Sequence, residues 1–469
     1  MLRFLTAGES HGKGLVTIVE GLPAGMPFTS DQVRYQLARR RLGYGRGPRM
    51  RIEADEVTIL AGVRHGRTLG SPVAIEIANS EWEAKWKEEM SPDPGKPSKV
   101  LTTPRPGHAD LAGMQKYGLG DARDVLERAS ARETAARVAA GSLAKALLSE
   151  IGVYVVSHTI QMGDERSDAQ LRPMPEDIDR VDASSVRCLD KDAEQRMISA
   201  IKAAAKEGDS LGGVSEIIAY GVPVGLGSHV HWDRKLDGLL AQAICSIHAV
   251  KAVEIGDGFS NASLRGSQAH DAIYFEDGGI SGRDSSGSPS SPSSPANPGS
   301  PSSPANPGSP SSPANPGSPS SPANPSSQSS SANSGSSGRY KKSSDEITAT
   351  IPSANSGSSG GYKRRTSRAG GIEGGISIGG DIIVRAYMKP LATLNRPVIE
   401  TVDLATGERA LSFKERTDTT AVPAMGVVAE AMVALTLASE ALRKYGGDSL
   451  AEFKANYNNS IEALQTLFV

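Results

Sequence analysis

The sequence contains little cysteine, with two cysteines in 469 residues. Cys188 and Cys245 lie far apart and match no metal-binding or redox spacing. This excludes a disulfide scaffold, which a chain of this length does not need in order to bury a core. We expect buried or half-buried free thiols in a reducing compartment.

Net charge is also low. The chain has 51 Lys and Arg residues and 53 Asp and Glu residues, for a formal charge of −2. The protein is therefore not a general polycation, and nucleic acid is not its expected partner. Any anion that it binds must be held by a local group of basic side chains.

Long hydrophobic runs are not evident either. The N-terminal MLRFLTAGESHG has no apolar signal-peptide region, and no run approaches the roughly 18 apolar residues of a membrane span. We therefore expect a soluble, cytoplasmic protein with no membrane partner. No metal site is expected, because His229 and His231 share one face of a predicted strand but no third ligand follows at a suitable spacing.

A break in composition dominates the chain. Residues 280–361 are rich in Ser, Pro, Asn and Gly, and the unit PSSPANPGS begins at Pro292, Pro301 and Pro310. Such a segment cannot bury enough apolar surface to offset the entropy of ordering. We predict a disordered insertion, with a Pro-rich ligand for a partner domain as the alternative. The folded domain then comprises residues 1–279 and 362–469, which a short surface turn would otherwise join.

Outside the insertion, the pattern is mixed α and β. VTIVEGLP, SPVAIEIAN and GDIIVRAYM alternate or run apolar between glycines and prolines, as strands do. Residues 121–152 and 423–446 are long, alanine-rich and helical in character. Because helices this apolar are usually internal, we predict an α+β fold with helices buried between sheets, not a coat of helices around one parallel sheet.

The stretch GESHG is the first that carries chemistry. Ser10 and His11 lie between glycines, where the backbone can turn sharply and approach a ligand. A histidine there can donate a proton to a leaving group near neutral pH. The alternative is a surface turn with an incidental histidine.

The stretch from Arg34 to Arg51 has seven arginines and no acidic residue. Its glycines allow several guanidinium groups to converge on one phosphate or carboxylate. A solvated basic face is the alternative. RNA binding would predict more interleaved aromatic residues than Tyr35 and Tyr44.

Two polar stretches follow in the middle of the chain. RPGHAD places His108 in a Pro-Gly turn. ERASARET places Arg128, Ser130 and Arg132 on a predicted helix, where structural salt bridges are the alternative.

Two more stretches lie after the insertion. RAGGIEGGISIGG offers backbone N–H groups for a phosphate or a flavin, although it has neither the dinucleotide fingerprint nor a P-loop. ERTDTTAVPA places Arg416 and Asp418 at the start of the second apolar helix, where a solvated helix start is the alternative.

Together these stretches resemble the chorismate synthase family over nearly the whole chain outside the insertion. GESHG with EGLPAG, RRRLGYGRGPRMR, RPGHAD, ERASARET, RAGGIEGGIS and ERTDTTAVPA occur in the family's order at compatible separations. The resemblance implies a β-α-β sandwich, with helices packed between antiparallel sheets, and a homotetramer. It also implies a carbon–oxygen lyase of the shikimate pathway. This enzyme uses reduced FMN for the anti-1,4-elimination of phosphate from 5-enolpyruvylshikimate 3-phosphate, giving chorismate.

The resemblance assigns roles to matching residues. His11 would protonate the departing phosphate beside Ser10, His108 would serve the reduced flavin, and Asp418 would help to move the flavin's proton. The substrate arginines would be Arg40, Arg46 and Arg49, and NADPH is a candidate flavin reductant that would use the first two. The remaining flavin contacts would be Arg128, Ala129, Ser130, Gln242, Ala243, Gly374, Lys389, Pro390, Leu391, Ala392, Thr393 and Arg416.

The sequence departs from the family pattern just before RAGGIEGG. The insertion enters there, and KRRTSRAGG lacks the Asn that often precedes this motif. Any effect of the insertion on the site is therefore expected at the flavin-binding segment that begins with RAGGIEGG. Two alternatives stay open: an inactive member acting as an interaction scaffold, and another FMN-dependent oxidoreductase acting on an anionic substrate.

Overall fold

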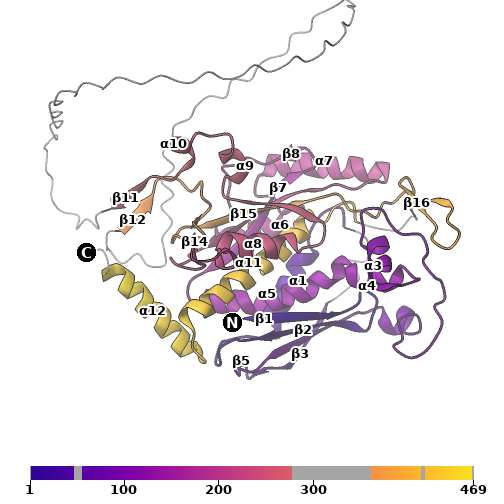
Figure 1. The fold of residues 1–469 in the computed structure, drawn as a ribbon, viewed down its shortest axis with the longest axis horizontal. Coiled ribbons are helices and arrows are strands. Elements are labelled where there is room, and N and C mark those ends of the chain that lie inside the picture. The colour runs from indigo at the N-terminus through magenta and orange to yellow at the C-terminus, as the bar shows by residue number, and fades with distance from the viewer. Residues whose placement is uncertain (1, 47–54, 277–360, 413–417, 467–469) are drawn as a thin grey trace, which may run out of the picture. The chain divides into compact units, whose positions relative to one another are not determined.

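The computed structural model describes residues 2–46, 55–276, 361–412 and 418–466 (Figure 1). Two predicted site residues, Arg49 and Arg416, lie outside these ranges, and so do residues 280–360 of the predicted insertion.

Two antiparallel sheets form the outer layers of the fold. Strands of the first sheet alternate buried with half-buried residues, as in VAIEIA at 73–78, so one face of the sheet points into the core. In sheet order, the first sheet consists of β1 (Arg3–Gly8), β2 (Gly14–Glu20), β6 (Val73–Ala78) and β3 (Glu56–Ala61). The second consists of β10 (Val250–Ile255), β15 (Ile382–Met388), β9 (Gly213–Tyr220), β7 (Tyr154–Met162) and β8 (Glu165–Arg166).

A layer of helices lies between the two sheets (Figure 1). Helix α5 (Thr134–Ser149) packs on the first sheet, α11 (Val422–Tyr445) packs on the second, and the two helices contact each other. They approach closely because Gly141 has no side chain: a Cβ built on it would lie 2.3 Å from Ala431 Cβ. This arrangement confirms the predicted sandwich of helices between antiparallel sheets. The layer also contains α1 (Ser30–Arg41) and α8 (Leu236–Cys245).

Helix α11 corrects the prediction that no run approaches the length of a membrane span. It is long and apolar enough by composition, with a mean hydropathy of 1.7 in its most apolar window. However, 89% of that window is buried inside the protein. The helix is apolar all round because it is the central element of the helical layer.

The predicted helix over residues 121–152 is broken at Ser130. Helix α4 (Arg123–Ala129) ends there, and Ser130 is extended, with φ −67° and ψ 143°. A 3₁₀ turn (Ala131–Glu133) then leads into α5. The Ser130 hydroxyl accepts a hydrogen bond from the Arg132 backbone N–H, and this local bond competes with continuous helix.

Short elements complete the described part of the chain. The helices are α3 (Asp110–Tyr117), α6 (Ile178–Ala183), α7 (Lys191–Glu207), α9 (Gly258–Asn261), α10 (Gly266–Ala269) and α12 (Leu450–Thr466), with 3₁₀ turns at Pro175–Asp177 and Trp232–Arg234 and a π-helical turn at Trp82–Trp86. Two-stranded ribbons pair β4 (Val63–Arg64) with β5 (Arg67–Thr68), β11 (Ile273–Glu276) with β12 (Gly361–Arg364), β13 (Ile372–Glu373) with β14 (Ile376–Ser377), and β16 (Glu400–Val402) with β17 (Arg409–Leu411).

The structure also tests the predictions for two histidines and for the two cysteines. His229 and His231 lie in a loop before α8, not on a strand, because the chain turns through the 3₁₀ segment there. Cys188 is buried, as predicted, whereas Cys245 at the end of α8 is exposed, so the prediction of a buried or half-buried thiol was wrong for Cys245. Its position falls on the face of α8 that turns away from the core.

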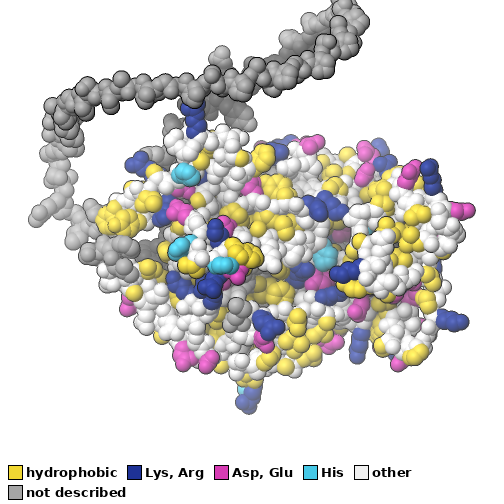
Figure 2. All heavy atoms as spheres, viewed as in Figure 1, with side chains coloured by type: hydrophobic (Ala, Val, Ile, Leu, Met, Phe, Trp, Pro, Cys, Tyr) yellow, Lys and Arg dark blue, Asp and Glu magenta, His cyan; other side chains and the backbone are white. Residues whose placement is uncertain are grey.

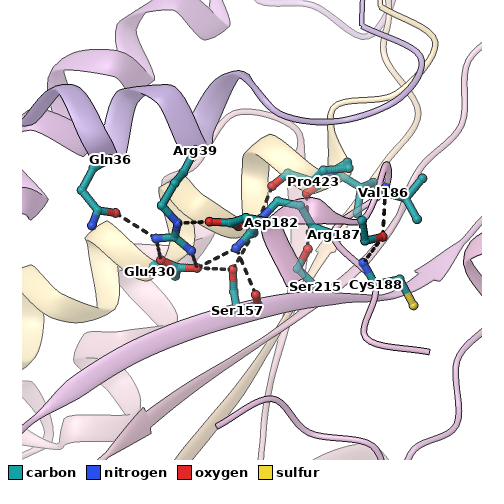
Figure 3. Close-up of polar contacts among 12 residues, drawn as sticks. Gln36, Arg39, Ser157, Asp182, Val186, Arg187, Cys188, Ser215, Pro423 and Glu430 are labelled. Atoms are coloured by element: carbon teal, nitrogen blue, oxygen red, sulfur yellow. Dashed lines mark hydrogen bonds and ion pairs between the residues drawn. The ribbon is translucent and has the colours of Figure 1, made fainter. Parts of the chain in front are cut away.

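Charged side chains are buried inside the helical layer (Figure 3). The Arg39 guanidinium donates to both Glu430 oxygens, at 2.6 and 2.9 Å, and to Asp182 at 2.6 Å. Arg187 also donates to both carboxylates, at 3.2 and 2.8 Å, and Lys145 pairs with Glu430. We call these five residues the buried charge cluster. The cluster joins α1, α5 and α11 at the C-terminal end of α1, where Arg40 follows Arg39.

Candidate active site

A cavity of about 840 Å³ opens where the motifs meet. Its walls come from the β1–β2 loop, the ends of α1 and α4, the 105–109 loop, the turn between α8 and β10, the segment after β15, and the start of α11. Among its described lining residues are five basic side chains, two acidic ones and three histidines. This is the local basic group that a chain of nearly zero net charge needs in order to bind an anion.

The structure sorts the predicted site residues into three groups. Those that line the cavity are Ser10, His11, Arg40, Arg46, His108, Ala129, Ser130, Lys389, Leu391, Ala392, Thr393 and Asp418. Those that do not line it are Arg128, Gln242, Ala243, Gly374 and Pro390. Arg49 and Arg416 are outside the described residues.

The β1–β2 loop carries His11 into the cavity. The His11 backbone N–H donates to Glu127 Oε2 at 2.8 Å, and the ring Nδ1 lies 2.9 Å from Glu127 Oε1. The Ser10 backbone N–H donates to the Glu127 carbonyl at 3.0 Å, and the Ser130 hydroxyl lies 3.1 Å from the Ser10 hydroxyl. The loop is therefore docked on α4 and on the break that follows it.

The arginine wall is built at the end of α1. Arg40 is buried, and it donates to Thr134 Oγ1 at 3.0 Å and to the Ala131 carbonyl at 2.9 Å. Arg46 follows the glycine-rich turn, and its Nε lies 3.2 Å from Asp418 Oδ2. Two guanidinium groups are therefore held in place before any substrate arrives.

His108 also lines the cavity, on a loop joined to the segment after β15. Its Nδ1 contacts the buried Asp110 carboxylate, which also accepts from Arg105 Nε at 2.8 Å. Burial alone would raise the pKa of Asp110, but the hydrogen bonds from His108 and Arg105 hold this pKa well below its usual range. Lys389 donates to the Gly107 carbonyl at 2.6 Å, and Arg105 donates to Thr393 Oγ1 at 3.2 Å.

A third histidine, His248, was missed by the sequence analysis. It lies in the turn between α8 and β10, and its Nδ1 is 3.9 Å from Glu133 Oε2. Nδ1 is buried and has no hydrogen-bond partner among the described residues. Burial lowers the pKa of His248, although Glu133 opposes the shift. The turn is held at the cavity by the pairing of β10 with β15, which begins at Val250↔Met388, and by the hydrogen bond from the Lys389 N–H to the Ala249 carbonyl at 3.0 Å.

Other side chains have structural roles away from the cavity. Gln242 is exposed on α8, six residues before His248 in the sequence. Arg128 turns toward β1, where it donates to the Thr6 carbonyl at 2.7 Å and the Gly8 carbonyl at 3.1 Å. Gly374 lies in the β13–β14 turn, and the next residue, Gly375, caps the start of α8 through its carbonyl.

The cavity has the size and lining of a small-molecule or cofactor site. Its volume falls within the range of about 300–1,000 Å³ that small-molecule and cofactor sites occupy. Leu391, Met425 and Val428 supply apolar wall for a ring system, and Lys389 supplies positive charge for a phosphate.

On the outer surface in Figure 2, side chains of both charge signs are mixed, with no single basic patch on that face.

The fold thus brings basic side chains and histidines together in one cavity of a size that suits a small molecule. The family model for chorismate synthase matches residues 2–294 and 330–442. A chorismate synthase from Salinispora tropica is 48% identical over 473 aligned positions that cover 99% of each chain, and one from Thermobifida fusca is 46% identical over 475 positions with the same coverage. A crystal structure of chorismate synthase, 32% identical, covers 99% of each chain with a TM-score of 0.66.

The chain therefore belongs to the chorismate synthase family of carbon–oxygen lyases, enzymes of the shikimate pathway. The predictions of family, fold class and activity are confirmed.

Proposed function

We propose that this chain carries out its elimination in the cavity described above, with 5-enolpyruvylshikimate 3-phosphate at the His11 and Arg46 wall and reduced FMN at the His108 and Lys389 wall. One observation carries the proposal. Two imidazoles, each held by a buried carboxylate, line the same cavity as five basic side chains.

At the substrate wall, Arg40 and Arg46 bind the phosphate and carboxylates of the substrate, because guanidinium groups suit both anions. His11 donates the proton that the departing phosphate takes up, and Ser10 orients that phosphate by hydrogen bonding. The bond that breaks joins the ring carbon to the phosphate oxygen. Arg40 and Arg46 stabilise the charge that develops on this oxygen.

At the flavin wall, the residues that would hold the cofactor are Ala129, Ser130, His248, Lys389 and Thr393. When bound, reduced FMN supplies electron density for the elimination and accepts the ring hydrogen, with no net redox change over the turnover.

Two further acid–base groups line the cavity, one at each wall. His108, held at Nδ1 by Asp110, keeps a proton available there. Asp418 orients Arg46 and is placed to accept a proton close to the substrate.

An anaerobic assay with chemically reduced FMN and the substrate tests the proposal, with phosphate release and chorismate absorbance as readouts. We expect stoichiometric products without net flavin oxidation. His11→Ala and His108→Ala should each lose about 10²–10⁴-fold in kcat, the contribution of a positioned acid or base. The control is His231→Ala, which changes an exposed histidine outside the cavity.

Full activity in His11→Ala would contradict the assigned role of His11. Flavin binding without product in the wild-type chain would favour an inactive scaffold. Net hydride transfer to the substrate would favour a different oxidoreductase.

Finer expectations complete the proposal, and they rest on the family resemblance. We infer a cytoplasmic homotetramer, which light scattering of the purified protein tests by mass. We infer that Arg40 and Arg46 also serve NADPH if the enzyme reduces its own flavin. Anaerobic flavin reduction by NADPH should then be lost in Arg46→Ala, and an Arg46→Ala variant that still reduces the flavin would contradict this inference.

The catalytic domain is proposed to consist of residues 1–279 and 362–469. Residues 280–361, which lie between these two parts, are proposed to be a passive, disordered insertion. In support, β11 pairs with β12 from Ile273↔Arg364 to Glu276↔Gly361, so its two flanks lie side by side. The family model also omits residues 295–329. Excision of residues 281–360 should leave kcat within about twofold, and lost activity with an intact fold would refute the proposal.

A further inference from the structure

Glu127 holds His11 from two directions. One carboxylate oxygen accepts from the His11 backbone N–H at 2.8 Å, and the other lies 2.9 Å from the ring Nδ1. The two residues come from segments 116 positions apart. We propose that Glu127 is the positioning residue of His11: it fixes the imidazole with Nδ1 toward the carboxylate and stabilises its protonated form for proton donation. The inference rests on the proposed role of His11.

The geometry selects one ring nitrogen for the chemistry. A carboxylate only accepts hydrogen bonds, so Nδ1 must carry the hydrogen in this contact. With Nδ1 committed to Glu127, Nε2 is the nitrogen that can deliver a proton to a substrate in the cavity that His11 lines. A carboxylate that fixes the tautomer and orientation of a catalytic imidazole acts in this way in hydrolase triads.

Glu127 is built to stay ionised. It is 3% exposed, and Arg123, one turn earlier on α4, donates to its Oε1 at 3.2 Å. Burial raises the pKa of Glu127, but the hydrogen bond and charge of His11 outweigh it, so this pKa is lowered. The negative charge therefore persists beside His11 at neutral pH.

Trp86 covers this pair. Its ring lies on the His11 imidazole, with centroids 4.0 Å apart and an angle of 30° between the planes. The Arg123 guanidinium lies 5.2 Å from the indole. The π-helical turn that carries Trp86 thus limits water at the His11–Glu127 contact, and less water means less screening of the attraction between the two charges.

Other charged groups surround His11 and can affect its titration. Glu9 and Lys13 lie on its own loop, and Arg123 and, behind it, Glu89 lie on the α4 side. From the cavity side come Glu81, Arg40, Arg46, Arg132 and Asp418. The Glu127 carboxylate contacts both the backbone N–H and the ring Nδ1 of His11.

The test compares Glu127→Gln, Glu127→Asp and a matched control, Glu89→Gln. Glu89 also lies near Arg123, at 3.6 Å, without contacting His11. We expect Glu127→Gln to lose at least about tenfold in kcat at pH 8, a fraction of what a positioned acid contributes. KM should change less than kcat. The alkaline decline of kcat should move to lower pH, because the imidazolium has lost its counter-charge. Glu127→Asp should recover part of the rate, and Glu89→Gln should retain it.

A second readout needs no flavin. Inorganic phosphate, titrated calorimetrically into the FMN-free protein at pH 8, should bind several-fold more weakly to Glu127→Gln than to wild type, and Glu89→Gln should bind it as wild type does. If the Gln variant does not fold, the Asp variant carries both measurements, with smaller changes of the same sign.

A double-mutant cycle separates positioning from general stability. In a His11→Gln background, Glu127→Gln should cost almost nothing further in kcat, because the interaction is already gone. An equal loss in both backgrounds, an unchanged pH profile, or an effect matched by Glu89→Gln would overturn the inference. Wild-type activity in His11→Gln alone would instead overturn the proposed function of His11.

Discussion

Glu430 offers the sharpest test of how the helical layer is held together. Its carboxylate is fully buried and faces Arg39 and Arg187 (Figure 3). It also pairs with a third basic side chain, Lys145. Asp182 is the only other carboxylate of the buried charge cluster, as defined above. Glu430→Gln keeps the shape of the side chain but leaves three buried cations with one anion.

The expected loss of stability is large. Breaking a buried ion pair by removing one partner costs about 3–5 kcal/mol, because the remaining charge has no compensation. The amide can still hydrogen-bond to Ser157, whose hydroxyl donates to Glu430 at 2.6 Å, so we expect about 3 kcal/mol. Whole proteins are stable by only about 5–15 kcal/mol. The variant should therefore fold but unfold at a clearly lower urea concentration.

The pH dependence has a definite sign. Burial raises the pKa of Glu430, but the charges of Arg39, Lys145 and Arg187 hold it far below the ordinary value of 4.5. A carboxylate with a depressed pKa in the folded state stabilises the fold above its unfolded pKa, and this stability is lost as the pH falls. The gap between wild type and Glu430→Gln should be full at pH 7 and shrink below pH 4.5.

Urea unfolding at pH 7 and pH 4, followed by circular dichroism, measures this gap. The control is Glu440→Gln, a buried carboxylate on the same helix with Arg443 as its basic partner. Lys145→Met added to Glu430→Gln should restore part of the loss, because one excess cation is removed. A Glu430→Gln variant within about 1 kcal/mol of wild type, or no less stable than the control, would refute the reasoning.

Three further predictions concern packing, thiols and a buried acid. Gly141→Ala should lower stability by about 1–3 kcal/mol in urea unfolding, since its Cβ would overlap Ala431 between α5 and α11, and a stabilised variant would contradict this packing. Ellman's reagent should label Cys245 alone in the native protein and both thiols after denaturation, because burial raises the pKa of Cys188 to about 11; native labelling of Cys188 would count against its burial. Burial raises the pKa of Asp381 from 3.8 to about 6, so its protonated form is favoured in the fold and stability is lost as pH rises through 6. Asp381→Asn should therefore be more stable than wild type at pH 8, by up to about 3 kcal/mol, with little difference at pH 4.

Many of the residues that line the cavity could be predicted from the sequence, because they belong to short motifs of polar residues and glycine or proline. His11, His108 and Arg46 each lie beside glycine or proline, in loops that strands and helices present to one cavity. The buried helical layer was also predictable, since α5 and α11 are too apolar to face water.

Other features could not be predicted, because they depend on contacts between distant segments. The break at Ser130 follows from a hydrogen bond that local propensity does not rank above helix. Gln242 and His248 lie on the same apolar stretch, and the sequence offers no reason to prefer one over the other. Gln242 is exposed on α8, whereas His248 lies in the turn after that helix, where it lines the cavity.

The sequence alone determined the family, the α+β class and the loops that carry the acids and arginines, because residue type and spacing limit what chemistry a short segment can do. The tertiary structure decided which carboxylate serves each imidazole. Asp110 is a sequence neighbour of His108, but Glu127 reaches His11 across 116 positions. A contact of this kind exists only after the β1–β2 loop has docked on α4. Its strength comes from burial, which removes the water that would otherwise screen the two charges.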